Sequence, residues 1–202
     1  KAVAQNTYNG AFGHIPGLEI ARPTVALVGR VVPIKDVKSF ITAAKLLIAR
    51  VPDLRALVIG PTDEDPSYFE ECVALVEMLG LGHCVEFTGT VNVVDVMPSI
   101  HVSVLTSLSE SQPLVVLEAG AAGIPFVATD VGSCREIIDG RPDESPRLGP
   151  GGIVTGLVAP AEIAEALAQL LADHALRHSC AANLRERVRR YYTSEQAAGS
   201  YN

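Results

Sequence analysis

Short apolar runs alternate with longer amphipathic stretches through most of the chain, and this rhythm constrains the fold more than any other feature. Several runs are rich in β-branched residues and are apolar at both odd and even positions, as strands buried on both faces must be. The alternation therefore predicts an α/β fold with a doubly wound, six-stranded, parallel Rossmann-like sheet. The runs are residues 24–29, 54–60, 84–89, 101–106, 125–129 and 152–155.

The stretches between these runs carry apolar residues at helical spacing. Residues 37–50 have this pattern, and residues 68–79 and 161–172 repeat it. A further helix is expected over residues 175–192, which contain a basic run. We interpret that run as a solvated helix face near a C-terminus, where cations are favoured, rather than as a patch for membranes or nucleic acids. Its members are Arg185, Arg187, Arg189 and Arg190.

Two parts of the chain fall outside the rhythm. Residues 1–23 are rich in Gly, Pro and Asn, and we expect a lead-in or linker segment before a domain at 24–192, with a tail at 193–202. Residues 139–152 form a long polar loop, and loops of that length are commonly lids or mobile connections. The chain begins at Lys1 rather than at a methionine, which favours a piece of a longer protein.

Composition argues against several classes of function. With 48% hydrophobic and 19% charged residues, the chain is not expected to be disordered. Its 16 basic and 23 acidic residues leave a net charge of −7, which disfavours nucleic acid as a partner. No apolar run reaches the roughly 18 residues that a membrane span needs. The cysteines form no C-x-x-C pair, which predicts reduced thiols in a cytoplasmic protein rather than a zinc site.

Ligands of an open parallel sheet bind outside the carboxyl ends of its strands, so the loops there are the candidate sites. The loop after the first run, residues 29–36, has no G-x-G-x-x-G pattern, and a dinucleotide cofactor is therefore not indicated. It carries Arg30 and Lys35 just before a helix that Asp36 can cap. A diphosphate suits these cations, Arg as a bidentate fork and Lys as a point charge. Taken alone, two ordinary exposed residues in a turn explain the loop equally well.

The fourth apolar run leads into the stretch ESQPLVVLEA. Pro113 fits the first position of a helix, where the free amides of Leu114 and Val115 would form a site for phosphate. Glu110 lies in the loop just before that helix. Glu118 interrupts an apolar run, so we expect a buried carboxylate that needs donors such as the hydroxyls of a ribose or another sugar. The less favoured alternative is a Glu118 that faces solvent or pairs with an internal arginine.

Glycines and an acidic triplet complete the set of candidates. Gly120 lowers helix propensity, which suggests a close approach to neighbouring elements or to a ligand. Gly132 can let the backbone approach a ligand, although turn geometry explains it as well. Residues 63–65 have the D-x-D spacing that some metal-dependent transferases use. Helix capping explains the triplet better, because it lies directly before Pro66 and a helix.

Together these motifs resemble the retaining glycosyltransferases of family 4. The resemblance rests on G-R-x₄-K at 29–35, on seven residues between Glu110 and Glu118, and on A-x-A-x-G-x-P at 119–125. The segments VGRVVPIKDVKSFITAA, ESQPL and TDVGSCREIIDG are similar to the soluble glycosyltransferase of Pel-type exopolysaccharide systems. The likeness extends over residues 24–192. It departs from the usual pattern at Ser111, where Gly is common, and at Gly120, where a larger residue is usual.

The resemblance implies a GT-B enzyme with two Rossmann domains and an active site between them, of which this chain is the C-terminal, donor-binding half. It implies transfer of a sugar from a nucleoside-diphosphate sugar, expected to be a UDP-sugar, to a saccharide acceptor in exopolysaccharide synthesis. No cofactor is implied, because the nucleotide-sugar is a substrate. No metal is implied either, because the two cations and the helix amides near Leu114 would neutralise the charge of the diphosphate. The N-terminal domain of the same protein would be a missing partner, so the chain alone is expected to be inactive. Peripheral association with a membrane polysaccharide-export complex is a further expectation.

The resemblance also assigns roles to residues. Arg30 and Lys35 would bind the donor diphosphate and stabilise the leaving group, and Glu110 would bind the transferred sugar. These three are the expected catalytic residues. Glu118 would take the ribose hydroxyls, and the backbone around Val91 would face the base. The remaining donor-binding residues would be Ser111, Gln112, Pro113 and Leu114.

Other functions stay open on the sequence. A sugar-nucleotide epimerase of related fold would need acid–base residues, and none stands out. A non-catalytic nucleotide-sensing domain would have a degenerate site, whereas Arg30, Lys35, Glu110 and Glu118 are all present. A flavodoxin-like receiver domain is least favoured, because Arg30 occupies the place of the acidic pocket that it needs.

Overall fold

The computed structural model describes residues 22–192, so the expected tail and all but the end of the expected lead-in segment lie outside the described residues. Each strand lies within one residue of the apolar run that predicts it. The strands are β1 (Thr24–Val28), β2 (Arg55–Ile59), β3 (Val85–Gly89), β4 (Val102–Leu105), β5 (Phe126–Thr129) and β6 (Gly152–Thr155).

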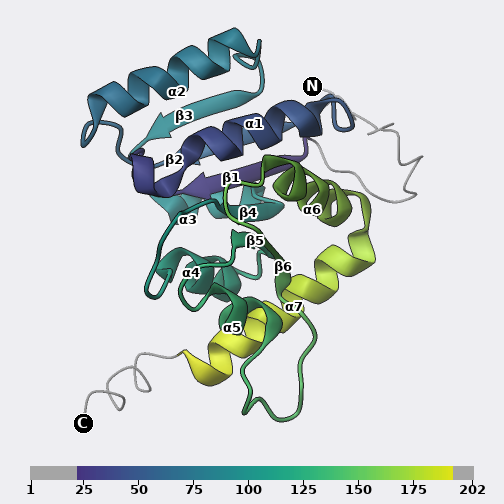
Figure 1. Ribbon diagram of the computed structural model, residues 1–202. Coiled ribbons are helices and arrows are strands. Elements are labelled where there is room, and N and C mark those ends of the chain that lie inside the picture. The colour runs from purple at the N-terminus through teal and green to yellow at the C-terminus, as the bar shows by residue number, and fades with distance from the viewer. Residues whose placement is uncertain (1–21, 193–202) are drawn as a thin grey trace.

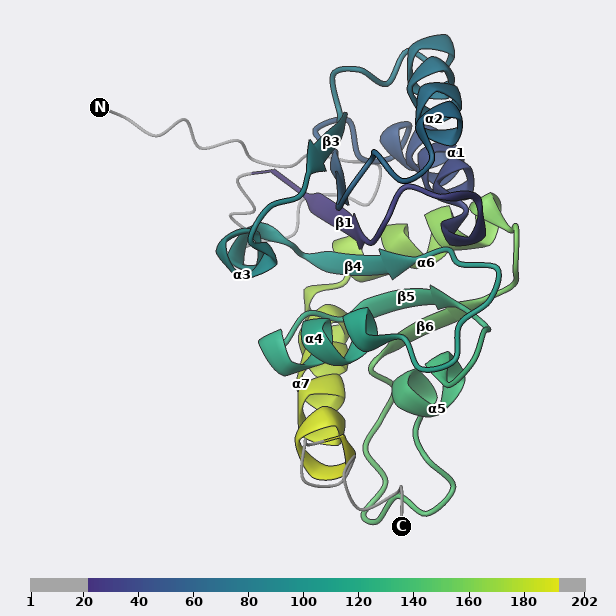
Figure 2. The same ribbon diagram turned by 90° about the vertical axis from the view of Figure 1, so that its left-hand side faces the viewer.

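The strands form one six-stranded sheet in the order β3-β2-β1-β4-β5-β6, and every pairing is parallel. The predicted doubly wound, parallel sheet is thus confirmed. From β1 the chain winds outward through β2 to β3, then returns to the other side of β1 and winds through β4, β5 and β6 (Figure 2). The winding direction reverses between β1 and β4, and this is the topological switch point of the sheet.

Helices cover both faces of the sheet (Figure 1). Helices α1, α2 and α6 pack into one hydrophobic cluster, α4 and α5 pack into the other, and α7 contributes to both. The four helices expected from the sequence, three of them from apolar periodicity, are confirmed to within two residues. The helices are η1 (Pro33–Lys35), α1 (Val37–Ile48), α2 (Pro66–Met78), α3 (Val93–Val96), η2 (Met97–Ser99), α4 (Leu114–Ala122), α5 (Cys134–Asp139), α6 (Pro160–Ala172) and α7 (His174–Tyr191).

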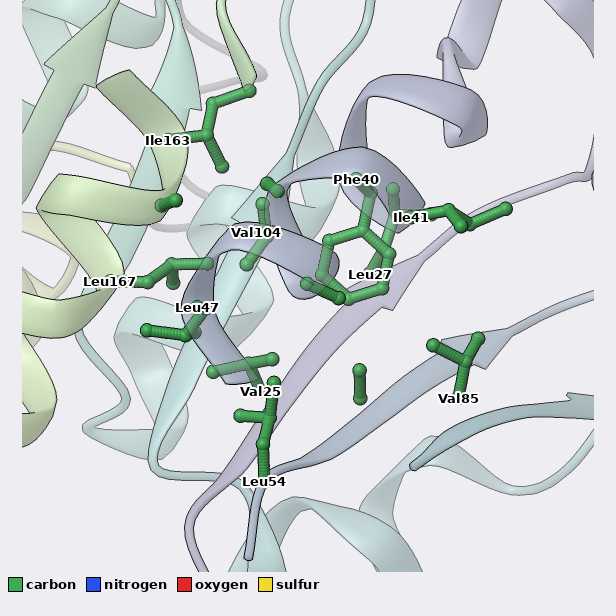
Figure 3. Close-up of a cluster of buried hydrophobic side chains, with 14 of the residues drawn as sticks. Val25, Leu27, Phe40, Ile41, Leu47, Leu54, Val85, Val104, Ile163 and Leu167 are labelled. Atoms are coloured by element: carbon green, nitrogen blue, oxygen red, sulfur yellow. The ribbon is translucent and has the colours of Figure 1, made fainter. Parts of the chain in front are cut away.

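The larger cluster lies between the sheet and helices α1 and α6 (Figure 3). Phe40 and Leu47 of α1 and Leu167 of α6 are fully buried there against Val25 and Val104 of the sheet. Burial of each such side chain contributes about 1.5–3 kcal/mol relative to leaving it in water. The switch-point strands therefore have a rigid support, which fixes the loops that follow them. None of the described helices has the length and apolar composition required to cross a membrane.

The long polar loop after α5 is attached to α7 through Arg187. The guanidinium of Arg187 donates to Glu144 through Nε at 3.0 Å and through Nη2 at 3.1 Å, and neither side chain is exposed. Nη2 also donates to the carbonyl of Gly149 at 2.8 Å, and Nη1 donates to that of Ile138 at 2.9 Å. The interpretation of the basic run as a solvated face is therefore wrong for Arg187. Its charge is buried because the loop supplies a carboxylate and carbonyl oxygens to satisfy it.

Candidate functional site

The loops that follow β1 and β4 meet at the switch point. Lys35 is the last residue of η1, which follows β1, and Glu110 lies in the loop after β4. Because β1 and β4 are adjacent and parallel, their carboxyl ends open at the same edge of the sheet. The backbone N–H of Leu108 donates to the carbonyl oxygen of Ile34 at 2.9 Å and joins the two loops. Ligands of doubly wound sheets bind in the crevice at this position.

Lys35 and Glu110 form an ion pair across the switch point. Lys35 Nζ lies 2.5 Å from Glu110 Oε1, and the side chains are 21% and 15% exposed. Ser107 Oγ lies 2.7 Å from the same oxygen and donates to it. Lys35 and Glu110, which the sequence predicts to bind the same nucleotide-sugar, therefore lie together, and their opposite charges compensate each other.

Buried hydroxyl groups make hydrogen bonds to the backbone of the loops after β1 and β4. Thr106 Oγ1 lies 2.8 Å from the carbonyl oxygen of Lys35 and 3.0 Å from that of Asp36. Thr129 Oγ1, at the end of β5, donates to the carbonyl oxygen of Ser107 at 2.7 Å. Thr106 and Thr129 are fully buried and Ser107 is nearly so. None of these three residues was predicted as a site residue, although hydroxyl side chains at the ends of apolar strands were a usable signal.

Asp36 begins α1 as predicted. Its side chain accepts a hydrogen bond from the backbone N–H of Ser39, and its backbone is left-handed with φ of 45°. A residue other than glycine adopts this conformation only where surrounding structure holds it. Here Thr106 and the first turn of α1 do so, which fixes the direction in which the preceding Lys35 leaves the backbone.

Arg30 has a different carboxylate partner from Lys35. Its guanidinium pairs with Glu64 in the loop after β2, and both side chains are about half exposed. The loops come together because β1 and β2 are neighbours and the N–H of Val31 donates to the carbonyl of Pro61 at 2.9 Å. The two cations expected to bind one diphosphate thus lie in one loop but contact separate acidic residues.

The acidic triplet at 63–65 was expected to cap the helix that follows it, and one of its residues does so. The Asp65 carboxylate accepts a hydrogen bond from the N–H of Tyr68 at 3.0 Å and caps α2, which confirms the capping interpretation for this residue. Glu64 is instead the partner of Arg30. Within residues 22–192, no group of three or more His, Cys, Asp or Glu side chains is arranged to hold a metal ion.

The structure corrects two expectations about α4. Pro113 has extended backbone with ψ of 97° and is the N-cap, so the helix begins one residue later than predicted, at Leu114. Glu118 is exposed, not buried, and the less favoured alternative was right. It shares an exposed face with Leu114, which is 63% exposed, because the helix packs through Val116 and Ala119 on its other side. The N–H of Val116 donates to the carbonyl oxygen of Pro113 at 3.0 Å, whereas the N–H groups of the two residues before it have no acceptor inside the helix.

Two glycines allow parts of the protein to approach each other closely. A Cβ at Gly120 would lie 2.8 Å from Val188 Cγ2, so the expected close approach is to α7. A Cβ at Gly132 would lie 2.4 Å from the carbonyl oxygens of Glu110 and Ser111, and φ there is 51°. The loop after β5 therefore supports the loop that carries Glu110.

The other expected site residues lie at the same sheet edge, but none has a hydrogen bond or ion pair with Lys35 or Glu110 in the part of the chain that the structure describes. Val91 follows β3 and is exposed. Ser111 and Gln112 are exposed in the loop before α4. Among the described residues, none of Arg30, Val91 and Glu118 bonds to Lys35 or Glu110. The exposed members of the set are Arg30, Val91, Ser111, Gln112, Leu114 and Glu118.

Cys134 lies next to this site but does not supply a nucleophile. It is the first residue of α5 and is fully buried. Burial raises the pKa of its thiol to about 11, so the thiol stays protonated at neutral pH. Cys72, Cys84 and Cys180 are likewise buried and free.

Comparison with known proteins finds one family model, described as group 1 glycosyl transferases, which matches residues 22–173. A D-inositol 3-phosphate glycosyltransferase of Corynebacterium urealyticum is 30% identical over 184 residues, 87% of this chain and 41% of the relative. The chain spans less than half the length of this relative and of several other D-inositol 3-phosphate glycosyltransferases that it matches.

Two solved structures illustrate the likeness of the fold. The C-terminal domain of a group 1 glycosyl transferase from Francisella tularensis has a TM-score of 0.73 and 26% identity, covering 86% of this chain and 89% of that domain. The Anabaena protein HepE, solved with UDP-glucose, has a TM-score of 0.77 and 22% identity, covering 91% of this chain and 50% of HepE. The six-stranded parallel sheet with flanking helices is therefore the Rossmann-like arrangement of GT-B glycosyltransferases.

Proposed function

The chain belongs to the group 1 glycosyl transferases, and from this premise we propose that it is the donor-binding domain of a retaining glycosyltransferase. The donor would be a nucleoside-diphosphate sugar, with uridine as its base. The observation that carries the proposal is the position of Lys35 and Glu110, a cation and a carboxylate at the switch point of the sheet. A cation is suited to the diphosphate, and a carboxylate is suited to the hydroxyls of the sugar attached to it.

Charge is the main argument for the diphosphate. The chain has a net charge of −7, yet Arg30 and Lys35 lie in one loop at the sheet edge where ligands bind. The first-turn amides of α4 at Leu114 and Val115 are aligned by a helix of nine residues, whose dipole favours an anion. Together these groups can neutralise the leaving diphosphate. We therefore propose that the reaction needs no metal ion.

The remaining contacts follow from position along the same edge. Glu118 and Leu114 lie on the exposed face of α4, where the Glu118 carboxylate can accept the ribose hydroxyls without being desolvated beforehand. Val91 after β3 would face the base, and Ser111 and Gln112 would contact the donor near Glu110. HepE of Anabaena is solved with UDP-glucose, which supports a uridine nucleotide here.

The chain spans less than half the length of the D-inositol 3-phosphate glycosyltransferases that it matches, so the activity of the whole protein belongs to the proposal. A second Rossmann domain of the same protein would supply the opposite wall of the active site and the saccharide acceptor. We place the reaction in the cytoplasm and in exopolysaccharide synthesis, with peripheral attachment to a membrane export complex. These assignments rest on the motif resemblance.

Calorimetric titration of the chain with UDP, UMP and uridine tests the proposal. UDP should bind most tightly, and UMP should bind at least about tenfold more weakly, because the second phosphate is the one that reaches the cations. Binding should be the same with EDTA as with Mg²⁺. Equal affinity for UDP and UMP, or a requirement for Mg²⁺, would contradict it.

A further inference from the structure

Both protein bonds to the Glu110 carboxylate end on the same oxygen. Lys35 Nζ lies 2.5 Å and Ser107 Oγ lies 2.7 Å from Oε1. Within the described part of the chain, no hydrogen bond or ion pair reaches Oε2. The carboxylate is therefore held through Oε1, and Oε2 can accept a hydrogen bond from another group.

The two partners of Oε1 differ in how firmly they are held. Lys35 has a long side chain that is 21% exposed, and it carries the charge that a diphosphate would attract. Ser107 has a short side chain and is 1% exposed. Its carbonyl oxygen accepts a hydrogen bond from the buried Thr129, so its backbone is fixed to the neighbouring strand β5. Ser107 is thus a rigid and electrically neutral donor.

When a nucleotide-sugar binds, the bond from Lys35 to Glu110 and the bond from Ser107 to Glu110 are expected to respond differently. An anionic diphosphate competes with Glu110 for the ammonium group of Lys35, and a flexible lysine can turn toward it. The hydroxyl of Ser107 is not needed by the diphosphate and can remain on Oε1. Glu110 then stays in place although its cationic partner is shared.

We propose that Ser107 is a positioning residue that keeps Glu110 oriented while Lys35 binds the diphosphate, so that Oε2 accepts a hydroxyl of the transferred sugar. The inference rests on the proposed function, because it assumes a nucleotide-sugar at this edge of the sheet. It adds to that function a role for Ser107 in favouring the binding of the UDP-sugar over that of UDP. Removal of the hydroxyl should therefore weaken recognition of the sugar more than recognition of UDP.

The test compares affinities for UDP and for UDP-sugars in the full chain. UDP-glucose, UDP-galactose and UDP-N-acetylglucosamine are titrated, and the one that binds most tightly is used with each variant. In Ser107→Ala, the affinity for that UDP-sugar should fall about tenfold, as expected for loss of a hydrogen bond to a charged group, while that for UDP changes less than about twofold. Ser109→Ala is the matched control, because Ser109 is an exposed serine of the same loop. It should leave both affinities unchanged.

A double-mutant cycle separates positioning from a general structural effect. If Ser107 acts through Glu110, Ser107→Ala should cause no further loss of UDP-sugar affinity in a Glu110→Ala background. Ser107→Cys keeps the size of the side chain with a weaker donor, and it should reproduce the selective loss if the alanine variant proves unstable.

The outcomes distinguish this inference from the proposed function. A wild-type chain that binds neither UDP nor any UDP-sugar overturns both. A wild-type chain that binds them, combined with Ser107 variants that leave the ratio of the two affinities unchanged or lose UDP-sugar affinity additively with Glu110→Ala, overturns the positioning role alone. A selective and non-additive loss supports it.

Discussion

Lys35 Nζ and Glu110 Oε1 lie 2.5 Å apart, although 75 residues separate them in the chain. They meet because they follow β1 and β4, the neighbouring strands between which the winding of the sheet reverses. The pair is partly exposed, so a ligand can reach it. Under the proposed function, an incoming diphosphate would replace the carboxylate as the partner of Lys35, and Ser107 would keep Glu110 in place.

Replacement of Lys35 by methionine should weaken binding of UDP by about ten- to a hundredfold, as expected for loss of a charge-assisted hydrogen bond. The neutral side chain keeps most of the packing of the lysine stem but no ammonium group. Calorimetry measures the change. Lys45→Met is the control, because Lys45 is exposed in the last turn of α1 and donates to the carbonyl of Leu79 at the C-cap of α2. Equal losses in the two variants would contradict a specific role for Lys35.

Gly132→Ala should destabilise the fold by about 2 kcal/mol or more and weaken UDP-sugar binding. Alanine is strained at φ of 51°, and its Cβ would lie 2.4 Å from the carbonyl oxygens of Glu110 and Ser111. The loop that carries Glu110 must move to admit it. Urea unfolding measures the stability. Gly82→Ala should change it by less than about 0.5 kcal/mol, because nothing lies within 4 Å of a Cβ there.

Arg187→Met should lower the free energy of unfolding by about 3–5 kcal/mol, because it leaves Glu144 buried without a cation. Arg55→Met provides the comparison, since its pair with Glu86 is partly exposed and is worth at most about 1 kcal/mol. Chemical unfolding followed by circular dichroism gives both values. Similar costs for the two variants would show that the loop after α5 does not depend on Arg187.

His101 should make the fold less stable in mild acid. Burial, aided by the nearby Arg177, lowers the pKa of this imidazole below its usual 6.5, and its Nδ1 accepts a hydrogen bond from the N–H of Thr24. The unfolded chain therefore binds a proton at higher pH than the native chain does. The contribution of the neutral imidazole is present above about pH 6.5 and is lost as the pH falls toward the native pKa.

Urea unfolding of wild type and His101→Asn from about pH 7.5 to pH 5 tests this sign. Asparagine can accept the Thr24 bond without titrating, so the variant should lose less stability than wild type on acidification. His83→Asn, an exposed position, should follow the wild-type curve. A steeper loss in His101→Asn than in wild type would contradict the assignment.

The fold was predictable because strands that are buried on both faces have apolar residues at both odd and even positions of the sequence. In β1, Val25, Ala26 and Leu27 are buried one after another, and a run that is apolar at every position indicates a strand covered on both faces. The parallel, doubly wound arrangement then followed from the alternation of strands with helices, whereas the order of the strands comes from the structure. The edge of the sheet that carries the site followed from the same topology, which is why Lys35 and Glu110 could be named together.

Side-chain environments were less predictable, for reasons that particular residues make plain. Helix α4 is apolar or small at every position except Glu118, so no periodicity marked its buried face. Arg187 belongs to a run of arginines whose other members are not buried, and only the folded loop brings Glu144 to it. Ser107 and Thr129 are visible in the sequence as hydroxyl residues at or just after the ends of strands, but the hydrogen bond between them depends on how β4 and β5 lie in the folded sheet.

The most direct test of donor binding is an NMR titration of the isotope-labelled chain with UDP. If UDP binds at the switch point, shift changes should concentrate at Lys35 and Arg30 after β1, at Glu110 after β4, and at Leu114 in the first turn of α4. Gly123, the C-cap at the opposite end of α4, should change little. No shift change at millimolar UDP, or changes centred away from the switch point, would contradict the claim that this sheet edge binds the nucleotide.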